Sequence, residues 1–463
     1  MARLIRLILA ALLLSLPATA QAAPAPARGH FLHLSDVHFD PLANPSLARA
    51  LIAAPIEQWE AILATSKLTG FPPPNQDSNY PLFKSMLDAA GAEHYDYVLF
   101  TGDYFPHEFY AKFTAAGGMP SEYAGFAIKT ALFIDAMMRR AFHDAPIVAA
   151  LGNNDALCGD YHLQSGSALL AAMARDLPAI ANNKAARTDF STLGYYIVPH
   201  PTVAKRDIIV IDDVYWVAES NRTWATNPSL CQPDNPADGP ALTTWLTNTL
   251  AAERKAGRSV TLMMHVPPGI NNYAAAKAGC PTGAPTLLGT PENDALVGLL
   301  TSYADTITEV YAGHTHMDDF RVVSGAGGKP LTPIKIGPSV SPIFGNGPSF
   351  TVFTYDRASG AATDYAVHTI VPAAAGPMAS SWKTEYSFSS AYKLPAYGAR
   401  SLATLAGRIR ADSATRLMFG SFYTGQSGAN PMQGANWLAY ACAETALAAS
   451  GYSACTCPMT AGS

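Results

Sequence analysis

The chain has 463 residues, with 30 Lys and Arg against 35 Asp and Glu, and a formal net charge of −5. Hydrophobic residues make up 49% and charged residues only 14%, which excludes a disordered chain, a coiled coil and a collagen-like fibre. The acidic balance argues against a general nucleic-acid binder, because such a protein needs a basic face.

The first residues carry the pattern of an export signal. Two arginines precede an apolar run over residues 7–16, and residues 20–22 (Ala-Gln-Ala) form a small-residue cleavage site. We therefore predict a Sec-type signal peptide over residues 1–22 and a flexible, Ala- and Pro-rich lead-in over residues 23–29. No later apolar run is long enough to span a membrane. The expected protein is secreted or periplasmic, soluble, without stable membrane insertion, and monomeric.

The six cysteines suit an exported protein, because disulfides persist outside the cytosol. The sequence does not choose among their possible pairings. Cys442 paired with either Cys455 or Cys457 would staple the C-terminal end of the chain.

Five short apolar runs have the length and composition of buried strands, and a cluster of polar residues follows each one. Helical patterns lie between them, most clearly from Asp238 to Gly257. Alternating strands and helices predict an α/β fold, in which ligand sites lie at the carboxyl ends of strands. The runs and their clusters are His30–Ser35 before Asp36-Val37-His38, Asp96–Thr101 before Gly102-Asp103, Pro146–Leu151 before Gly152-Asn153-Asn154-Asp155, Val260–Met264 before His265-Val266-Pro267, and Ile307–Ala312 before Gly313-His314-Thr315-His316.

Further strand-like runs follow around residues 333–337, 349–355 and 363–370. Residues 371–377 are rich in Ala, Pro and Gly and mark a predicted boundary. We expect a catalytic domain over residues 30–370 and a small, mainly helical C-terminal subdomain over residues 371–463. A role of this helical tail in docking another protein stays open as a non-enzymatic alternative.

The five polar clusters supply the oxygen and imidazole ligands that borderline divalent metals bind. Two-metal phosphatases need about seven or eight ligands, and their metals lie roughly 3.5–4 Å apart. Each residue alone is better explained as a turn former or a buried polar residue, and only the joint pattern predicts a dinuclear site. The candidate ligands are Asp36, His38, Asp103, Asn153, His265, His314 and His316.

The series D-x-H, G-D, G-N-x-D, H and G-H-x-H resembles the calcineurin-like metallophosphoesterase superfamily. Three further features resemble its acid-sphingomyelinase-like branch: His107 four residues after Asp103, the string from His265 to Gly269, and residues 339–350 (SVSPIFGNGPSF). The resemblance covers roughly residues 30–400. It implies a four-layered α/β/β/α sandwich, to which the helical C-terminal appendage expected from the residue pattern is added.

The resemblance also implies the roles of the ligands. Asp36, His38, Asp103 and His316 would hold one divalent metal, and Asp103, Asn153, His265 and His314 the second, with Asp103 bridging the two. Zinc is the first expectation, with manganese and iron as alternatives. A hydroxide bound by the two metals would attack phosphorus.

The chain departs from the superfamily at Asn154, where most members have a His that helps the leaving group depart. An Asn amide donates a hydrogen bond but delivers no proton, and a lost general acid lowers the rate roughly 10²–10⁴-fold. Either His107 serves as the acid, or the substrate has a leaving group that needs none. The endopolyphosphatase branch, which cleaves phosphoanhydrides, resembles this chain in its Asn-Asn-Asp form.

The leading hypothesis is an exported, metal-dependent phosphodiesterase or phosphohydrolase that acts on small soluble phosphoesters. Membrane sphingomyelin is a less favoured substrate, because no Cys-rich saposin-like segment precedes Asp36. One alternative is a hydrolase of polyphosphate or nucleotide phosphoanhydrides, which Asn154 favours and the low content of Lys and Arg disfavours. The alternative from another class is a catalytically silent protein that binds metal and phosphate.

Overall fold

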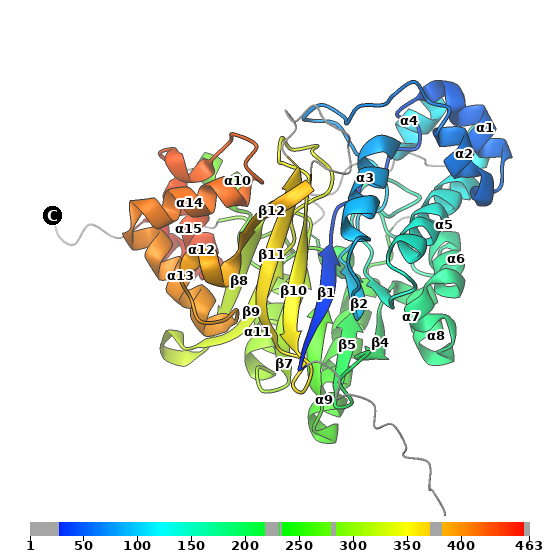
Figure 1. The fold of residues 1–463 in the computed structure, drawn as a ribbon. Helices are drawn as coiled ribbons and strands as arrows, with labels where there is room; N and C mark the ends of the chain where they lie inside the picture. The colour runs from blue at the N-terminus through cyan, green and yellow to red at the C-terminus, as the bar shows by residue number, and fades with distance from the viewer. Residues whose placement is uncertain (1–26, 218–230, 232–233, 279–283, 371–381, 458–463) are drawn as a thin grey trace, which may run out of the picture.

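The fold is described from a computed structural model of the chain (Figure 1). The structure describes residues 27–217, 231, 234–278, 284–370 and 382–457. The predicted signal peptide and the predicted boundary at residues 371–377 lie outside these residues. Among the described helices, none has the length and apolar character that crossing a membrane requires.

Two six-stranded mixed sheets form the centre of the described structure, with strand orders β12-β11-β10-β1-β2-β3 and β4-β5-β6-β7-β9-β8. Strands β1 to β3, and β5 to β7 with β9, pair in parallel, so the carboxyl ends of each set lie at one edge. All of the strands expected from the sequence are present. The bounds are β1 Arg28–Leu34, β2 Tyr97–Phe100, β3 Ile147–Ala149, β4 Tyr196–Pro199, β5 Arg206–Val210, β6 Ser259–Met263, β7 Ile307–Ala312, β8 Asp319–Ser324, β9 Pro330–Ile336, β10 Ser349–Asp356, β11 Ala362–Ile370 and β12 Trp382–Ser387.

Helices flank the two sheets (Figure 1), which confirms the layered α/β fold. The first strand begins at Arg28, two residues before the expected start at His30. The bounds of the helices are α1 Ala48–Ala53, α2 Trp59–Leu63, α3 Tyr80–Ala90, α4 Phe109–Ala115, α5 Tyr123–Ala141, α6 Ala168–Asp176, α7 Pro178–Ala181, α8 Lys184–Leu193, α9 Asp238–Ala256, α10 Asn272–Ala278, α11 Thr290–Ser302, α12 Phe388–Tyr392, α13 Ala399–Ala411, α14 Ser413–Tyr423, α15 Trp437–Ala443 and α16 Ala449–Thr456.

Aromatic side chains fill the space between the sheets. The ring of Phe31 in β1 lies 5.6 Å from the ring of Tyr311 in β7 and 4.8 Å from that of Phe353 in β10. All three side chains are buried, and burial of each large apolar side chain stabilises the fold by about 1.5–3 kcal/mol. This packing holds the two sheets, and therefore their carboxyl edges, in a fixed relative position.

Helix α9 shows how the sequence pattern sets the outer layer. Leu242, Leu246 and Leu250 lie one turn apart and are fully buried in the core of the second sheet. The helix ends at Gly257, whose φ of 65° is the left-handed conformation that glycine adopts at a helix C-terminus. The helix predicted from Asp238 to Gly257 is therefore confirmed.

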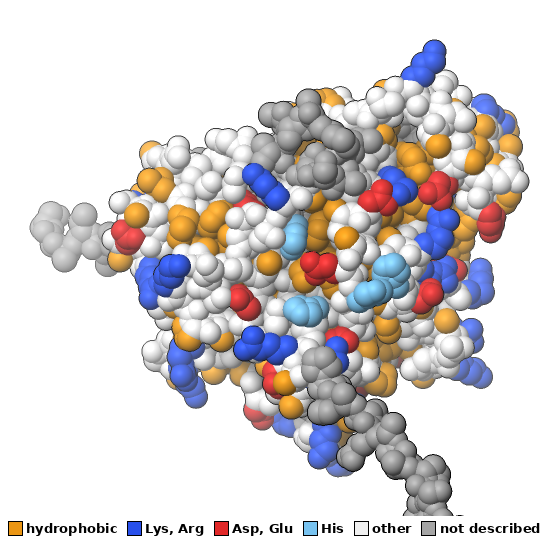
Figure 2. Space-filling view, viewed as in Figure 1, with side chains coloured by type: hydrophobic (Ala, Val, Ile, Leu, Met, Phe, Trp, Pro, Cys, Tyr) orange, Lys and Arg blue, Asp and Glu red, His pale blue; other side chains and the backbone are white. Residues whose placement is uncertain are grey.

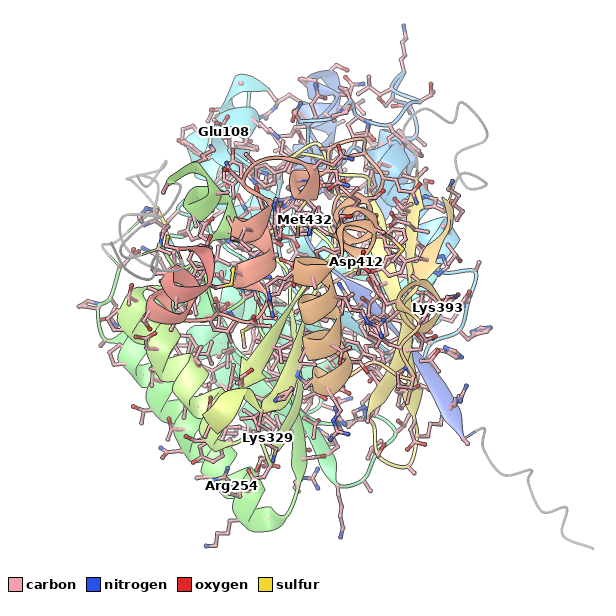
Figure 3. The ribbon with its side chains drawn as sticks, turned by 90° about the vertical axis from the view of Figure 1, so that its left-hand side faces the viewer. Glu108, Arg254, Lys329, Lys393, Asp412 and Met432 are labelled. Carbon is pink, nitrogen blue, oxygen red and sulfur yellow. A yellow bond between two sulfur atoms is a disulfide. The ribbon has the colours of Figure 1, made fainter. Side chains whose placement is uncertain are left out.

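The C-terminal region is mainly helical, as expected, but it is continuous with the sandwich. Strand β12 pairs with β11 at the edge of the first sheet. Phe388, Leu402 and Leu405 belong to the same hydrophobic core as Phe31. Figure 3 shows the C-terminal helices in front of the sheet, with Asp412 and Met432 on this face. The expected boundary near residue 371 therefore separates no independent core.

Two disulfides are described. Cys442 pairs with Cys455, which is one of the two expected partners, and Cys158 pairs with Cys231, 73 residues further along the chain. The Cys158–Cys231 disulfide restrains the loop that follows β3 and its polar cluster.

Charged side chains are scattered over the face shown in Figure 2, with basic and acidic groups interspersed.

Candidate metal centre

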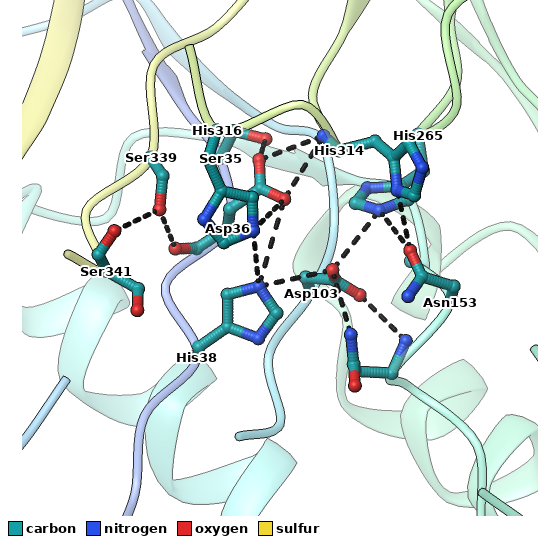
Figure 4. Close-up of polar contacts among 12 residues, drawn as sticks. Ser35, Asp36, His38, Asp103, Asn153, His265, His314, His316, Ser339 and Ser341 are labelled. Atoms are coloured by element: carbon teal, nitrogen blue, oxygen red, sulfur yellow. Dashed lines mark hydrogen bonds and ion pairs between the residues drawn. The ribbon is translucent and has the colours of Figure 1, made fainter. Parts of the chain in front are cut away.

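The seven predicted ligands come from five loops and meet at the carboxyl edges of the two sheets (Figure 4). Five of them have left-handed backbone conformations, which non-glycine residues rarely adopt. Such strain amounts to about 1–3 kcal/mol for each residue and concentrates at functional sites. The φ angles are 52° at Asp36, 41° at His38, 60° at Asp103, 70° at His314 and 64° at His316.

The motif glycines allow the loops to approach each other. A Cβ atom on Gly313 would lie 1.9 Å from Oγ of Ser35, and one on Gly152 would lie 2.2 Å from Oδ1 of Asp103. Both distances are far inside van der Waals contact, so any other residue would push the loops apart. The glycines in G-N and G-H-x-H are therefore required by packing around the ligands.

Asp36, His38, Asp103 and His316 form one ligand group. Nε2 of His38 lies 3.2 Å from Oδ2 of Asp103 and 3.1 Å from Nε2 of His316. Nε2 of His316 lies 3.4 Å from Oδ1 of Asp36. One ligand atom from each residue lies within 4.8 Å of the others, and all four side chains are buried. The group can hold a metal ion.

Asp103, Asn153, His265 and His314 form the second group. Nε2 of His265 lies 3.3 Å from Oδ2 of Asp103. Oδ1 of Asn153 lies 2.9 Å from Nε2 of His265 and 2.8 Å from Nδ1 of His314. The same oxygen of Asp103 therefore contacts an imidazole of each group, which is the position of a carboxylate that bridges two metals.

The surroundings of the histidines fit metal ligation. Nδ1 of His38 donates to the carbonyl oxygen of Phe105 at 2.8 Å, and Nδ1 of His265 donates to that of Thr101 at 2.7 Å. These bonds fix the ring orientations and leave each Nε2 facing the site, as hydrogen bonds to the other ring nitrogen of metal-binding histidines do.

The electrostatics of the site favour bound positive charge. Burial lowers the pKa of His38 and His265, but the carboxylate of Asp103 outweighs burial and raises them to about 9 and about 10. Burial also opposes ionisation of Asp103, yet the two imidazoles hold its pKa well below the usual range. Two buried carboxylates with imidazole and amide donors therefore suit a divalent cation of borderline character.

Asp155, which sequence reasoning left without a role, holds two of the ligand loops together. Its carboxylate accepts hydrogen bonds from the backbone N–H groups of Gly152 (2.8 Å), Asp103 (2.9 Å), Tyr104 (2.7 Å) and Phe105 (3.1 Å). Its place at the end of the G-N-x-D motif is the one feature of the sequence that could have indicated this role. A similar anchor, Asp213, accepts from the N–H of His265 at 3.1 Å.

The two candidate catalytic residues lie beside the ligands. The ring of His107 stacks on that of His38 with centroids 4.3 Å apart, and its Nδ1 lies 2.9 Å from Oδ1 of Asp77. The amide of Asn154 donates to Oδ2 of Asp103 at 3.2 Å. Both residues line a cavity of about 790 Å³ together with Asp103, Asn153, His314 and His316.

The C-terminal region contributes to the same cavity, which the sequence did not indicate. Tyr423, Asn430 and Tyr440 form part of its wall. These residues lie outside every metal-ligand motif, so only their position in the fold reveals them.

Comparison with known proteins agrees with the geometry. The family model described as calcineurin-like phosphoesterase matches residues 29–318. Human acid sphingomyelinase-like phosphodiesterase 3b is 25% identical over an alignment that covers 84% of this chain and 81% of that protein. The cyclic GMP-AMP phosphodiesterase SMPDL3A of Bos taurus is also 25% identical, with the same coverage of 84% and 81%. With the ligand loops and the family match in agreement, the chain belongs to the calcineurin-like phosphoesterases.

Proposed function

We propose that the protein is an exported phosphodiesterase that cleaves small soluble phosphodiesters at a dinuclear metal centre. The observation that carries the proposal is the contact of one oxygen of Asp103 with an imidazole of each ligand group. When bound, two divalent metals supply Lewis-acid activation of water and neutralise phosphoryl oxygens. Zinc remains the first candidate. The proposed ligands are Asp36, His38, Asp103, Asn153, His265, His314 and His316.

The chemistry of the cavity wall favours a substrate with a single phosphate. Among the described residues that line the metal cavity there is no Lys or Arg. A polyphosphate chain carries one charge per phosphate and needs cationic partners along its length. Apart from Asp160 and the residues of the metal centre, the wall presents uncharged groups, which suit a neutral or cationic organic substituent: Tyr161, Asn271, Asn272, Tyr273, Phe344, Tyr423, Asn430 and Tyr440.

We assign His107 as the general acid, because Asn154 cannot deliver a proton. Asp77 holds Nδ1 of His107 at 2.9 Å, so the other ring nitrogen is left to meet the leaving group. The amide of Asn154 lies in the metal cavity and can donate a hydrogen bond to a phosphoryl oxygen.

The test is product release by the purified, metal-analysed protein and its His107→Ala variant. The diester panel is bis-p-nitrophenyl phosphate, CDP-choline and dispersed sphingomyelin, and the anhydride panel is ATP and polyphosphate. We expect diester cleavage by the wild type, with the rate falling at least about 10²-fold in His107→Ala for CDP-choline. The loss should be smaller for p-nitrophenolate, because a good leaving group needs little acid assistance. Anhydride cleavage that is indifferent to His107 would instead favour the polyphosphatase alternative.

Replacement of Asp103 by Asn separates the enzyme from the silent metal- and phosphate-binding protein. The substitution removes the charge shared by both ligand groups, so we expect turnover to be lost and bound metal to decrease, as measured by mass spectrometry. A wild type that binds metal and phosphate but hydrolyses neither panel would support the silent alternative.

Export is supported by the two described disulfides, since disulfides are rare in reducing compartments. Fractionation of cells that express the full chain tests it, with N-terminal sequencing of the product to locate cleavage near residue 22.

A further inference from the structure

A second cavity lies beside the metal cavity. Its volume is about 870 Å³, and the segment over residues 67–76 forms much of its wall. His107 and Asn75 line both cavities, so the two meet at these side chains. The loop after β9 also borders both, because Ile343 lines the second cavity and the next residue, Phe344, lines the first.

A network of charged side chains forms the floor of the second cavity. Asp77 is buried and lies 2.9 Å from Nδ1 of His107 and 2.5 Å from Nζ of Lys112. Nζ of Lys112 also lies 3.2 Å from the carboxylate of Asp40. The ammonium group of Lys112 is therefore already held by two acids. Because these contacts join the floor to His107, the floor has a fixed position relative to the metal ligands.

The charges of this cavity disfavour an anion. Its titratable side chains other than His107 are the acids Asp40, Asp77 and Glu108 and the bases Lys67 and Lys112, an excess of one negative charge. Apolar side chains complete the wall, among them Leu68, Phe71 and Ile343. The combination suits an uncharged organic group with one apolar face.

Asn75 and the loop of residues 342–344 form a ridge between the two cavities, and this ridge presents an exposed aromatic ring. Phe344 is 56% exposed, although burial of such a side chain would stabilise the fold. Its ring lies 4.6 Å from the ring of His316 and 5.7 Å from that of His107. The N–H of Asn75 donates to the carbonyl oxygen of Pro342 at 3.0 Å, which joins the two sides of the ridge. An apolar ring is thus held beside the metal ligands, where a ligand can cover it.

We infer that the second cavity is a subsite for the second organic arm of a phosphodiester. The phosphate lies at the metal centre, one arm occupies the metal cavity with its aromatic and amide wall, and the other passes His107 into the second cavity. This arm is uncharged, and a cavity of about 870 Å³ has room for an aromatic ring or a sugar. The inference rests on the proposed phosphodiesterase function and adds that the preferred substrate has a substantial group on each side of phosphorus.

The variant that tests the subsite is Gly70→Trp. Gly70 lines the second cavity, and a Cβ atom there would have no heavy atom within 4 Å, so an indole can be added at the cavity wall without a clash at the backbone. The matched control is Gly298→Trp on the exposed side of α11. A Cβ atom there also has no heavy atom within 4 Å, and Gly298 lines neither of the two cavities. A second variant, Phe71→Ala, removes part of the cavity wall instead of filling the space.

The measurement is the inhibition constant of three anions against hydrolysis of methyl p-nitrophenyl phosphate. Dimethyl phosphate has no large arm, methyl phenyl phosphate has one and diphenyl phosphate has two. In the wild type and Gly298→Trp, we expect the second phenyl group to tighten binding about tenfold beyond the first. In Gly70→Trp and Phe71→Ala, diphenyl phosphate should bind no more than about twofold tighter than methyl phenyl phosphate. Thermal shifts with the same anions provide a readout independent of turnover.

The possible results distinguish failure of the subsite from failure of the proposed phosphodiesterase function. An equal gain from the second phenyl group in wild type and Gly70→Trp, or no gain in the wild type, would overturn the subsite while diester cleavage stands. A wild type that cleaves no diester would overturn the proposed function, and the subsite with it.

Discussion

The hydroxyl of Tyr386 donates a 2.5 Å hydrogen bond to Oδ2 of Asp318, two residues after the proposed ligand His316. The other oxygen of Asp318 accepts from the ammonium group of Lys335. The N–H of Asp318 donates to the carbonyl oxygen of Tyr423 at 3.0 Å. Strand β12 and helix α14 thus hold the loop that carries His316, so the C-terminal region supports the metal centre although it contains none of the ligand motifs.

Tyr386→Phe should lower kcat/KM about 2–10-fold, because one buried hydrogen bond that positions the His316 loop is lost. The metal content should decrease while the far-ultraviolet circular dichroism stays unchanged. The control is Tyr397→Phe, since the hydroxyl of Tyr397 is buried without a hydrogen-bond partner among the described residues. Equal kinetics in both variants would contradict a positioning role for Tyr386.

A chain that ends at residue 370 should not fold to a soluble, active protein. It would leave the edge of β11 unpaired and expose core residues that the C-terminal region contacts, such as Phe353 and Tyr365. Soluble yield and cooperative thermal unfolding are the measurements. A truncated protein with wild-type turnover would revive the alternative that the tail only docks a partner.

Asp155→Ala should lower the free energy of unfolding by about 3 kcal/mol or more, because four backbone N–H groups lose their shared acceptor. Asp155→Asn should have a smaller effect, since one side-chain oxygen remains. Urea denaturation measures both. The control Asp88→Asn breaks an exposed pair with Lys84 and should change stability by no more than about 0.5 kcal/mol. A similar small change in Asp155→Ala would refute the anchoring role.

Stability should decrease as pH rises from about 4 to about 8 through the titration of Asp135. Burial and the charge of Asp176 raise the pKa of this carboxyl to about 8. The unfolded chain loses the proton near pH 4, whereas the folded protein retains it until about pH 8, so the unfolded state binds fewer protons across this window. The loss is complete above the folded pKa.

Asp135→Asn should therefore reduce this pH dependence and raise the melting temperature at pH 8 relative to the wild type. The amide keeps an oxygen that can accept the 3.1 Å hydrogen bond from the hydroxyl of Tyr104 and stays neutral at every pH of the experiment. Melting curves from pH 5 to about pH 9 check the prediction. Parallel curves for the two proteins would show that Asp135 does not titrate in this window.

Local patterns were enough to predict the strands, the order of the ligand motifs and the layered class of the fold. A short run of buried residues that ends in Gly-Asp or Gly-His signals a strand and its carboxyl end, and the parallel central strands bring such ends to one edge. The closeness of Asp36 to His316, 280 residues apart in the chain, thus follows from motif and topology together.

Other features depended on long-range packing that no local pattern encodes. The left-handed conformations of the ligands arise because backbone contacts between loops, such as that of Asp36 with Gly102, hold each turn in place. The C-terminal region was predicted to be separate because residues 371–377 are rich in Ala, Pro and Gly, but the apolar faces of its helices complete the core of the first sheet. The second cavity has walls from four distant segments, around residues 40, 70, 108 and 343, so it exists only in the folded chain. The sequence by itself determined which chemistry is available, and the tertiary structure decided which residues surround it.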